Sequence, residues 1–191
     1  MGPGRPRSFE SAEVLEAATE LFWTRGYERT SKRDIMEATG LASQSLYNAF
    51  GDKHGLFMAC VRYYLETKLS STMVELQAEG SPLGNLKRVL STWVDSCDKG
   101  CMLINTAAEF GQEDPELAEF LRGCMAQGQE AYAAVLRRAH AAGEIAEELD
   151  PDAVAATLFT MASGLTLKKR LGATDAEIQA SIRGFLNLLE R

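Results

Sequence analysis

The sequence predicts an all-α protein of about nine helices. Apolar residues recur at helical spacing along most of the chain, whereas alternating β-branched runs and Asn-Gly or Asp-Gly hairpin turns are absent. Gly and Pro residues divide the chain into segments of helical length. With 191 residues, of which 46% are hydrophobic and 25% charged, the chain has the size and composition of one or two globular domains.

Four helices are expected in the first part of the chain. A Gly residue follows each of the first three, and glycine readily adopts the left-handed conformation that ends a helix. Asp52 precedes the fourth helix and offers a side-chain oxygen to its first free N–H groups. The predicted ranges are 9–25, 31–39, 43–50 and 53 to about 78.

Five more helices are expected downstream. Three of them begin with Ser-Pro or Asp-Pro, where the first residue caps the helix and the proline suits its first turn. Thr174 and Glu177 have the spacing of a capping box before the last helix. The predicted ranges are 82–98, 101–111, 115–142, 151–171 and 174–189.

The composition excludes several classes of protein. No run of about 18 apolar residues occurs, so no membrane span is expected, and the N-terminus lacks the apolar stretch of a secretory signal. A cytoplasmic protein with four reduced cysteines is the expectation. Neither of the two histidines lies near a Cys pair at zinc-finger spacing, so no metal and no cofactor are expected.

The net charge of −7 is unevenly distributed. Residues 1–58 hold seven basic and eight acidic residues, whereas the other 133 residues hold 13 basic and 19 acidic ones. The first eight residues carry Arg5 and Arg7 and no acid. The acidic excess therefore lies mostly downstream, and the N-terminal part is compatible with a polyanionic partner.

The second and third predicted helices have the layout of a helix-turn-helix, with Gly40-Leu41-Ala42 as the turn. Eight residues at 1.5 Å rise make a rod of about 12 Å, which fits a major groove about 12 Å wide. Leu46 and Phe50 are expected to anchor its inner face. The outer face would then present Ser43, Gln44, Ser45, Tyr47 and Asn48, whose amides suit adenine edges and whose phenol suits a phosphate.

Lys53 opens the fourth helix, where its charge and the helix N-terminus both favour a phosphate. The whole stretch from Val14 to Phe57 resembles, without gaps, the DNA-binding region of the TetR family of bacterial transcriptional regulators. The matching residues include Gly26-Tyr27, Thr30, Ile35, Gly40, Leu46-Tyr47, Phe50 and Lys53.

The resemblance implies a DNA-binding transcriptional regulator, a repressor that a small apolar or electrophilic effector releases from a palindromic operator. Two positions depart from the family, since Ala42 stands where a capping Ser is usual and Ser43 where a basic residue is frequent. Ser43 is the alternative cap. The predicted DNA contacts are Arg5, Arg7, Thr30, Ser31, Ser43, Gln44, Ser45, Tyr47, Asn48 and Lys53.

Residues 1–58 are predicted to form the N-terminal arm and DNA-binding domain, and residues 59–191 the ligand-binding and dimerisation domain. The last two helices carry apolar stripes with small residues such as Gly164, so we expect them to form a homodimer interface, although the stripes also suit the chain's own core. An effector pocket is expected between the middle helices, although plain core packing also accounts for its residues. The predicted lining is Trp93, Cys101, Met102, Phe110, Met125, Tyr132, Phe159 and Met161.

Cys101 follows Gly100 at a predicted helix start, where free N–H groups and the helix dipole favour a thiolate. Lys99 is close in sequence, and Cys97 is the candidate partner in a disulfide. The Gly-Cys pair resembles a subset of TetR-like regulators, some of which sense electrophiles. The alternative is an inert packing thiol.

Two other functions fit parts of the sequence. A helical enzyme would use Cys101 as its nucleophile, but neither His54 nor His140 supplies a base in a recognisable triad. A purely structural helical dimer would leave the set of Gln44, Tyr47 and Lys53 unexplained. Salt-dependent binding to duplex DNA separates the regulator from both alternatives.

Overall fold

The structure is a computed structural model that describes residues 8–96, 99–111 and 113–190. These residues form nine α-helices and no strands, which confirms the predicted fold class, and the bounds agree with the predicted ones to within two residues. The helices are α1 (Ser8–Arg25), α2 (Lys32–Thr39), α3 (Ser43–Phe50), α4 (Lys53–Leu76), α5 (Pro82–Ser96), α6 (Met102–Phe110), α7 (Pro115–Ala141), α8 (Pro151–Arg170) and α9 (Asp175–Leu189).

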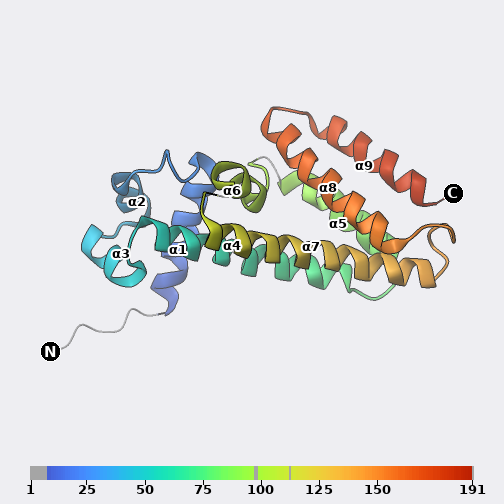
Figure 1. The fold of residues 1–191 in the computed structure, drawn as a ribbon, viewed down its shortest axis with the longest axis horizontal. Helices are drawn as coiled ribbons and strands as arrows, with labels where there is room; N and C mark the ends of the chain where they lie inside the picture. Colours follow the sequence, from blue (N-terminus) through green and yellow to red (C-terminus); the bar gives the residue numbers. More distant parts are fainter. Residues whose placement is uncertain (1–7, 97–98, 112, 191) are drawn as a thin grey trace.

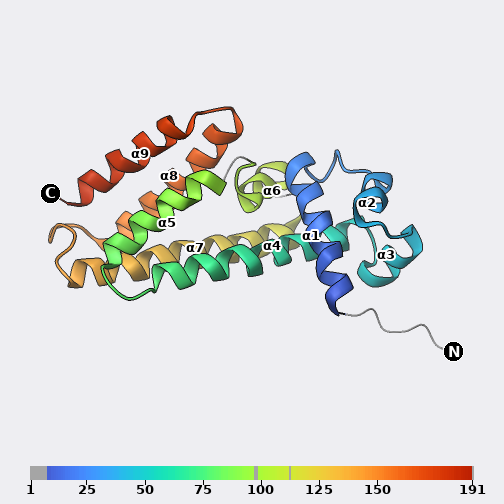
Figure 2. The ribbon, with the colours of Figure 1, turned by 180° about the vertical axis from the view of Figure 1, so that it is seen from behind.

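The molecule is elongated, with α4 and α7 packed together along its long axis (Figure 1). The helices α1, α2 and α3 lie at one end, whereas α5, α8 and α9 lie at the other. The short helix α6 lies between the two ends in both views (Figures 1 and 2). Because α4 and α7 contribute residues to both ends, a displacement of either long helix changes the packing at both ends.

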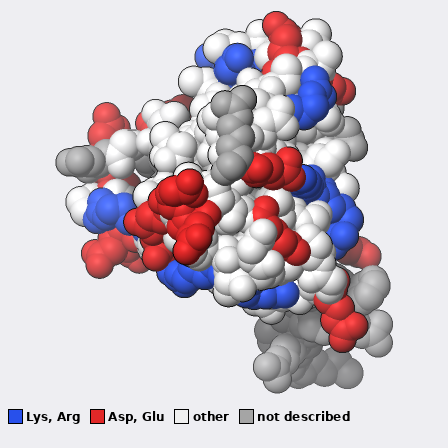
Figure 3. Space-filling model, turned by 90° about the vertical axis from the view of Figure 1, so that its right-hand side faces the viewer, with Lys and Arg blue, Asp and Glu red and all other residues white. Residues whose placement is uncertain are grey.

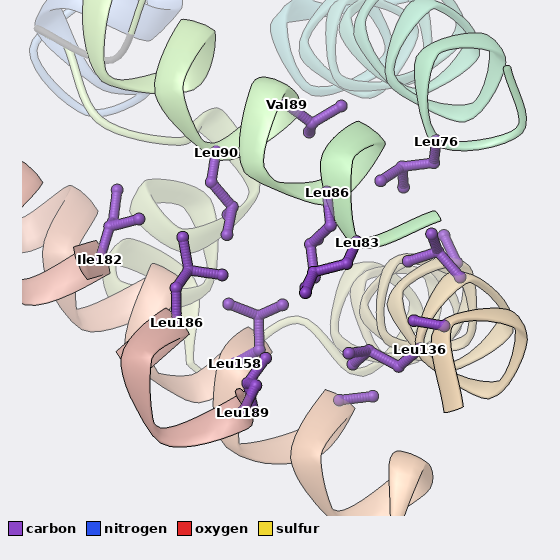
Figure 4. Close-up of a cluster of buried hydrophobic side chains, with 14 of the residues drawn as sticks. Leu76, Leu83, Leu86, Val89, Leu90, Leu136, Leu158, Ile182, Leu186 and Leu189 are labelled. Carbon is purple, nitrogen blue, oxygen red and sulfur yellow. The ribbon is translucent and has the colours of Figure 1, made fainter. Parts of the chain in front are cut away.

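Two clusters of buried apolar side chains stabilise the two ends. The C-terminal core joins the end of α4 to α5, α7, α8 and α9, and its labelled members converge in Figure 4. The N-terminal core joins α1–α4 through Phe22, Ile35, Leu46 and Phe57, and it also takes in Met102 and other residues of α6 and the start of α7.

The N-terminal core therefore extends beyond the predicted 1–58 domain, because α6 and α7 contribute to it. The helix α4 also runs unbroken across residues 58 and 59. The domain boundary stays a prediction.

The turn between α2 and α3 depends on its local chemistry. Ser31 and Asp34 form a reciprocal capping box at the start of α2, and Gly40 ends it at φ +68°, a conformation that disfavours side chains. The helix α3 begins at Ser43 with Ala42 as its N-cap, so the alternative in which Ser43 takes over the cap is wrong. No side chain caps the first N–H groups of α3.

Candidate functional site

The helix α3 lies at one end of the molecule (Figure 1), and three of its polar side chains are exposed. Leu46 is fully buried, as the inward anchor was predicted to be, and Ile35 of α2 lies in the same core. Gln44, Ser45 and Asn48 are exposed, and Ser43 is half-buried. These four side chains are therefore accessible to a partner from outside.

The residues before α2 are less available. Thr30 is buried, and its hydroxyl donates a hydrogen bond to the Gly26 carbonyl at 2.6 Å, so it stabilises the turn after α1 and its side chain faces no partner outside. The predicted DNA contact by Thr30 requires an exposed hydroxyl, whereas this side chain is buried. Ser31 is exposed, but its hydroxyl is 2.5 Å from Asp34 Oδ2.

The Asp34 carboxylate is held in its charged form. Hydrogen bonds from the Ser31 hydroxyl and backbone, and then the Arg25 guanidinium at 2.7 Å, lower its pKa to about 2. Arg25 is therefore committed to an intramolecular ion pair. Arg5 and Arg7 lie outside the described residues.

Tyr47 differs from the prediction that its hydroxyl points outward. Its hydroxyl oxygen is buried and has no hydrogen-bond partner among the described residues. The Lys32 ammonium lies 4.9 Å from the centre of its ring, and burial together with Asp52 raises the pKa of the phenol. Packing of the ring and the cation–π contact favour this inward position.

Lys53 lies at the start of α4, as expected. Its ammonium is 4.1 Å from the centre of the Tyr27 ring, and Asp52 beside it accepts a hydrogen bond from the Gly55 N–H at 2.8 Å. The cation is thus held in place by an aromatic ring rather than by a carboxylate. Two residues outside the predicted contacts orient two of the predicted ones. Lys32 contacts the Tyr47 ring, and the Tyr27 ring holds the Lys53 ammonium.

A cavity of about 410 Å³ lies in the middle of the molecule, lined by α1, α4, α5, α6, α7 and α8. This is within the usual size range of small-molecule sites. The exposed lining residues, Ser71 on α4 and Thr92 on α5, place its mouth between these helices. Four predicted residues line it: Trp93, Cys101, Tyr132 and Phe159.

The other four predicted residues do not line this cavity. Met102, Phe110 and Met125 pack in or against the N-terminal core, and Met161 packs against the C-terminal core. Periodicity identifies which residues turn inward, but it does not say which of two cores or a cavity they reach.

Several lining residues were missed. Trp23 comes from α1, within the predicted DNA-binding domain, and Tyr64 comes from α4, within the predicted ligand-binding domain. Cys124 and Gly128 come from α7. A Cβ at Gly128 would lie 3.0 Å from the Phe159 ring, so a larger residue there would displace that ring. Cys124, Gly128 and Tyr132 are spaced four residues apart and therefore share one face of α7. This spacing was the only sequence signal that could have identified Cys124 and Gly128 as lining residues.

Cys101 is the N-cap residue of α6, as predicted from its place after Gly100. The Tyr64 hydroxyl lies 3.9 Å from its sulfur. Lys99, which was expected to favour its thiolate, instead pairs with Glu20 and lies 5.2 Å from the centre of the Trp23 ring. Cys97, the candidate disulfide partner, lies outside the described residues.

The cavity is linked to α1–α3 through α6. At the first end, the Trp23 indole N–H donates to the Gly100 carbonyl at 3.0 Å. At the other end, the two carboxylate oxygens of Glu109 accept hydrogen bonds from the backbone N–H groups of Tyr27 and Glu28, both at 2.9 Å. A shift of α6 would therefore reach the turn between α1 and α2.

The helices α8 and α9 lie on the outer edge of the molecule in both ribbon views (Figures 1 and 2). Three leucines in or directly after these helices are unusually exposed: Leu167 at 57%, Leu171 at 80% and Leu188 at 58%. Gly164 of α8 and Gly184 of α9 have nothing within 4 Å of a built Cβ. The stripes predicted for dimerisation thus turn one side to the protein's own core and leave another side open.

The end of the molecule opposite α2 and α3 has a mixed surface, where Lys and Arg side chains are interspersed with groups of Asp and Glu (Figure 3). Among the described residues, no helix combines the length and the apolar character needed to cross a bilayer.

Comparison with known proteins gives consistent matches. Residues 14–60 match the sequences grouped as bacterial regulatory proteins, tetR family, and residues 82–185 match the tetracyclin repressor-like C-terminal domain. YezE of Bacillus subtilis, an uncharacterized HTH-type transcriptional regulator, is 34% identical over 193 residues, covering 98% of this chain and 100% of YezE. The HTH-type transcriptional repressor ComR of Escherichia coli is 30% identical over 177 residues, covering 90% of this chain and 84% of ComR.

One solved structure is similar in both sequence and fold. It is a cysteine mutant of the TetR family transcriptional regulator CifR complexed with 26 bp double-strand operator DNA. The two chains are 26% identical with a TM-score of 0.85, and the match covers 97% of this chain and 100% of the other.

Proposed function

The chain belongs to the TetR family of bacterial transcriptional regulators, and from this we propose that it is a homodimeric repressor in which α3 of each copy reads one half of a palindromic operator. The exposed polar face of α3 is the observation that carries the proposal. The operator complex of CifR and the repressor ComR support it by similarity. Because the partner is operator DNA, the cytoplasm is the proposed compartment.

The proposed contacts fall into two classes. Gln44, Ser45 and Asn48 are placed to contact base edges, whereas Ser43 and the uncapped N–H groups of α3 are placed for a phosphate. Lys53 and Tyr47 belong to the second class, with Tyr47 turning outward on binding. Arg5 and Arg7 are proposed as further contacts to DNA because of their positive charge.

Replacing Lys53 by Ala is expected to weaken binding to every DNA sequence by about fivefold and to lower the slope of log affinity against log salt by about one. The reason is that its ammonium, held over Tyr27, neutralises a phosphate and reads no base. Fluorescence anisotropy with operator and scrambled duplexes at several salt concentrations measures both quantities. Gln44→Ala is the contrasting variant, since it should relax preference at one base position with an unchanged salt slope.

If Lys53→Ala changes base preference and leaves the salt slope intact, the phosphate assignment is wrong. A protein without any salt-dependent affinity for duplex DNA would refute the proposed function as a whole.

We propose that the cavity holds a small apolar effector and that α6 transmits its binding. The aromatic lining suits an apolar molecule, and the contacts of Glu109 hold the turn that carries Tyr27, which in turn holds Lys53. An effector that fits only one position of α6 shifts the equilibrium by its difference in affinity for the two positions.

Replacing Glu109 by Ala is expected to speed hydrogen exchange of the Tyr27 and Glu28 amides at least about tenfold, because both lose a charged acceptor. Operator affinity should fall about threefold as Tyr27 and Lys53 lose their fixed position. Amide exchange followed by mass spectrometry or NMR is the measurement. Glu113→Ala removes the same charge from an exposed neighbour and serves as control; equal effects in both variants would mean that charge alone matters.

The alternative of a cysteine enzyme is not supported. The family is one of transcriptional regulators rather than enzymes. His54 is engaged by Asp114, with 2.6 Å between Nε2 and Oδ2, and it lines no part of the cavity that contains Cys101. Among the described residues, neither His54 nor His140 lines that cavity, so no histidine is placed to activate the thiol as a turnover nucleophile.

A further inference from the structure

The lining of the central cavity contains a single carboxylate. Glu75 of α4 is its one Asp, Glu, Lys, Arg or His side chain among the described residues, and it is half-buried. Within the part of the chain that the structure describes, the side chain of Glu75 takes part in no hydrogen bond and no ion pair. A charge that is partly removed from water is normally paired. The position is therefore suited to a cation that comes from outside the protein.

Two basic side chains on the helices beside α4 have other partners. Arg138 of α7 donates a hydrogen bond to the carbonyl of Leu76, the residue after Glu75, at 3.4 Å. Arg88 of α5 donates to the side-chain oxygen of Asn85 at 2.8 Å. The negative charge of Glu75 is thus left for another partner.

The rest of the lining favours an organic cation over a metal ion. Five of the lining residues are aromatic, namely Trp23, Tyr64, Trp93, Tyr132 and Phe159. The face of an aromatic ring attracts a positive charge, and rings that surround a cavity are a common way to bind quaternary ammonium groups. A hard metal ion needs several oxygen ligands, whereas Glu75 is the one carboxylate of the described lining.

The cavity has an aromatic end and an acidic end. Tyr64 and Glu75 both line it from α4, and eleven positions along a helix correspond to about 16 Å. At the Tyr64 end, the ring lies edge to face with Trp23, with 5.1 Å between the two ring centres. This arrangement suits a molecule with an apolar body and a positive charge at one end.

We propose that the effector is an organic cation, with an aromatic body that packs among the rings and one fixed positive charge that Glu75 binds. The inference rests on the proposed function, because it assigns the charge of the effector of that repressor. Glu75 and Lys53 belong to the same unbroken helix. A ligand that moves the far end of α4 therefore also moves its beginning, beside α3.

The test compares benzyltrimethylammonium with neopentylbenzene, which has the same shape but carries a carbon in place of the charged nitrogen. The cation is expected to bind with a Kd on the order of 100 µM, and the hydrocarbon at least about tenfold more weakly. A cavity that is merely apolar would prefer the hydrocarbon, which costs less to remove from water. Both tryptophans of the chain line the cavity, so their fluorescence reports its occupation, and calorimetry gives the affinities.

Glu75→Gln keeps the size of the side chain and removes its charge. It should weaken binding of the cation about tenfold and leave binding of the hydrocarbon unchanged. Because the carboxylate has no partner to lose, the melting temperature of this variant should not fall.

Glu79→Gln is the matched control, since Glu79 is exposed and lies outside the cavity lining. It should leave both affinities unchanged. The control is needed because a protein with a net charge of −7 attracts any cation from a distance.

Operator release is measured by anisotropy, with sodium chloride at the same ionic strength as the reference. Saturating benzyltrimethylammonium should lower the operator affinity of the wild type at least about tenfold, and Glu75→Gln should need about tenfold more of it.

Three results would overturn the proposal: no binding of the cation, binding of the hydrocarbon as tightly as the cation, or an equal loss of cation affinity in Glu75→Gln and Glu79→Gln. Cation binding at Glu75 that leaves operator affinity intact would refute its role as the effector. Failure of the proposed function is a separate result, because it is read from operator binding by the protein without any ligand.

Discussion

A protein carrying Gly164→Leu is expected to be a monomer that binds a palindromic operator at least about 30-fold more weakly than the wild type. In one protomer a side chain at this position meets nothing within 4 Å, so the fold itself accommodates it. A two-fold interface through α8 and α9 would receive the added leucine twice, at an overpacking cost of about 1–3 kcal/mol each. The exposed Leu167, Leu171 and Leu188 mark the same interface.

Gly123→Leu is the matched control, because Gly123 of α7 is also exposed with nothing within 4 Å of a built Cβ. Both changes should stabilise the isolated protomer by up to about 1 kcal/mol, since glycine is a poor helix former. Light scattering and operator titration then separate the two variants. A Gly164→Leu protein that remains dimeric would remove α8 and α9 as the proposed interface.

Replacing Tyr47 by Phe is expected to have opposite effects on stability and on function. The buried hydroxyl has no partner among the described residues, so its removal should stabilise the free protein by about 1 kcal/mol and raise the melting temperature by about 3 °C. Operator affinity should fall about tenfold, because the phenol's hydrogen bond to a phosphate is lost. Calorimetry and anisotropy measure the two changes.

The Lys32 contact makes a control for this result. Lys32→Met keeps an aliphatic side chain over the Tyr47 ring while removing the ammonium, so the phenol should turn outward more readily. A Tyr47→Phe protein with reduced stability would show that the hydroxyl has a bound water or another acceptor in solution. Unchanged operator affinity would remove Tyr47 from the contacts.

Most of the fold could be predicted because its determinants are local. Capping residues, helix-ending glycines and first-turn prolines act within four residues of the helix end, and they located all nine helices among the described residues. Leu46 was found for the same reason, since a 3.6-residue period places it opposite the polar face.

The site was only partly predictable because its determinants are distant in sequence. Thr30 is buried and its hydroxyl donates a hydrogen bond to the Gly26 carbonyl, and the Tyr47 ring turns inward beside Lys32 of another helix. Residues from six helices line the cavity, so no local sequence pattern identifies Trp23 or Tyr64 as a lining residue. Residue type alone did not separate Met102, which packs in a core, from Tyr132, which lines a space.

The unbroken helix α4 has a geometric consequence. Its 24 residues span about 36 Å, from Lys53 beside the α3 end to Leu76 in the C-terminal core. A tilt of about 5° about its far end moves its beginning by about 3 Å, nearly the rise of about 3.4 Å per phosphate of one strand along the duplex axis. In the proposed dimer, a tilt of α4 along the duplex axis by this amount would carry each head out of register by about one base pair.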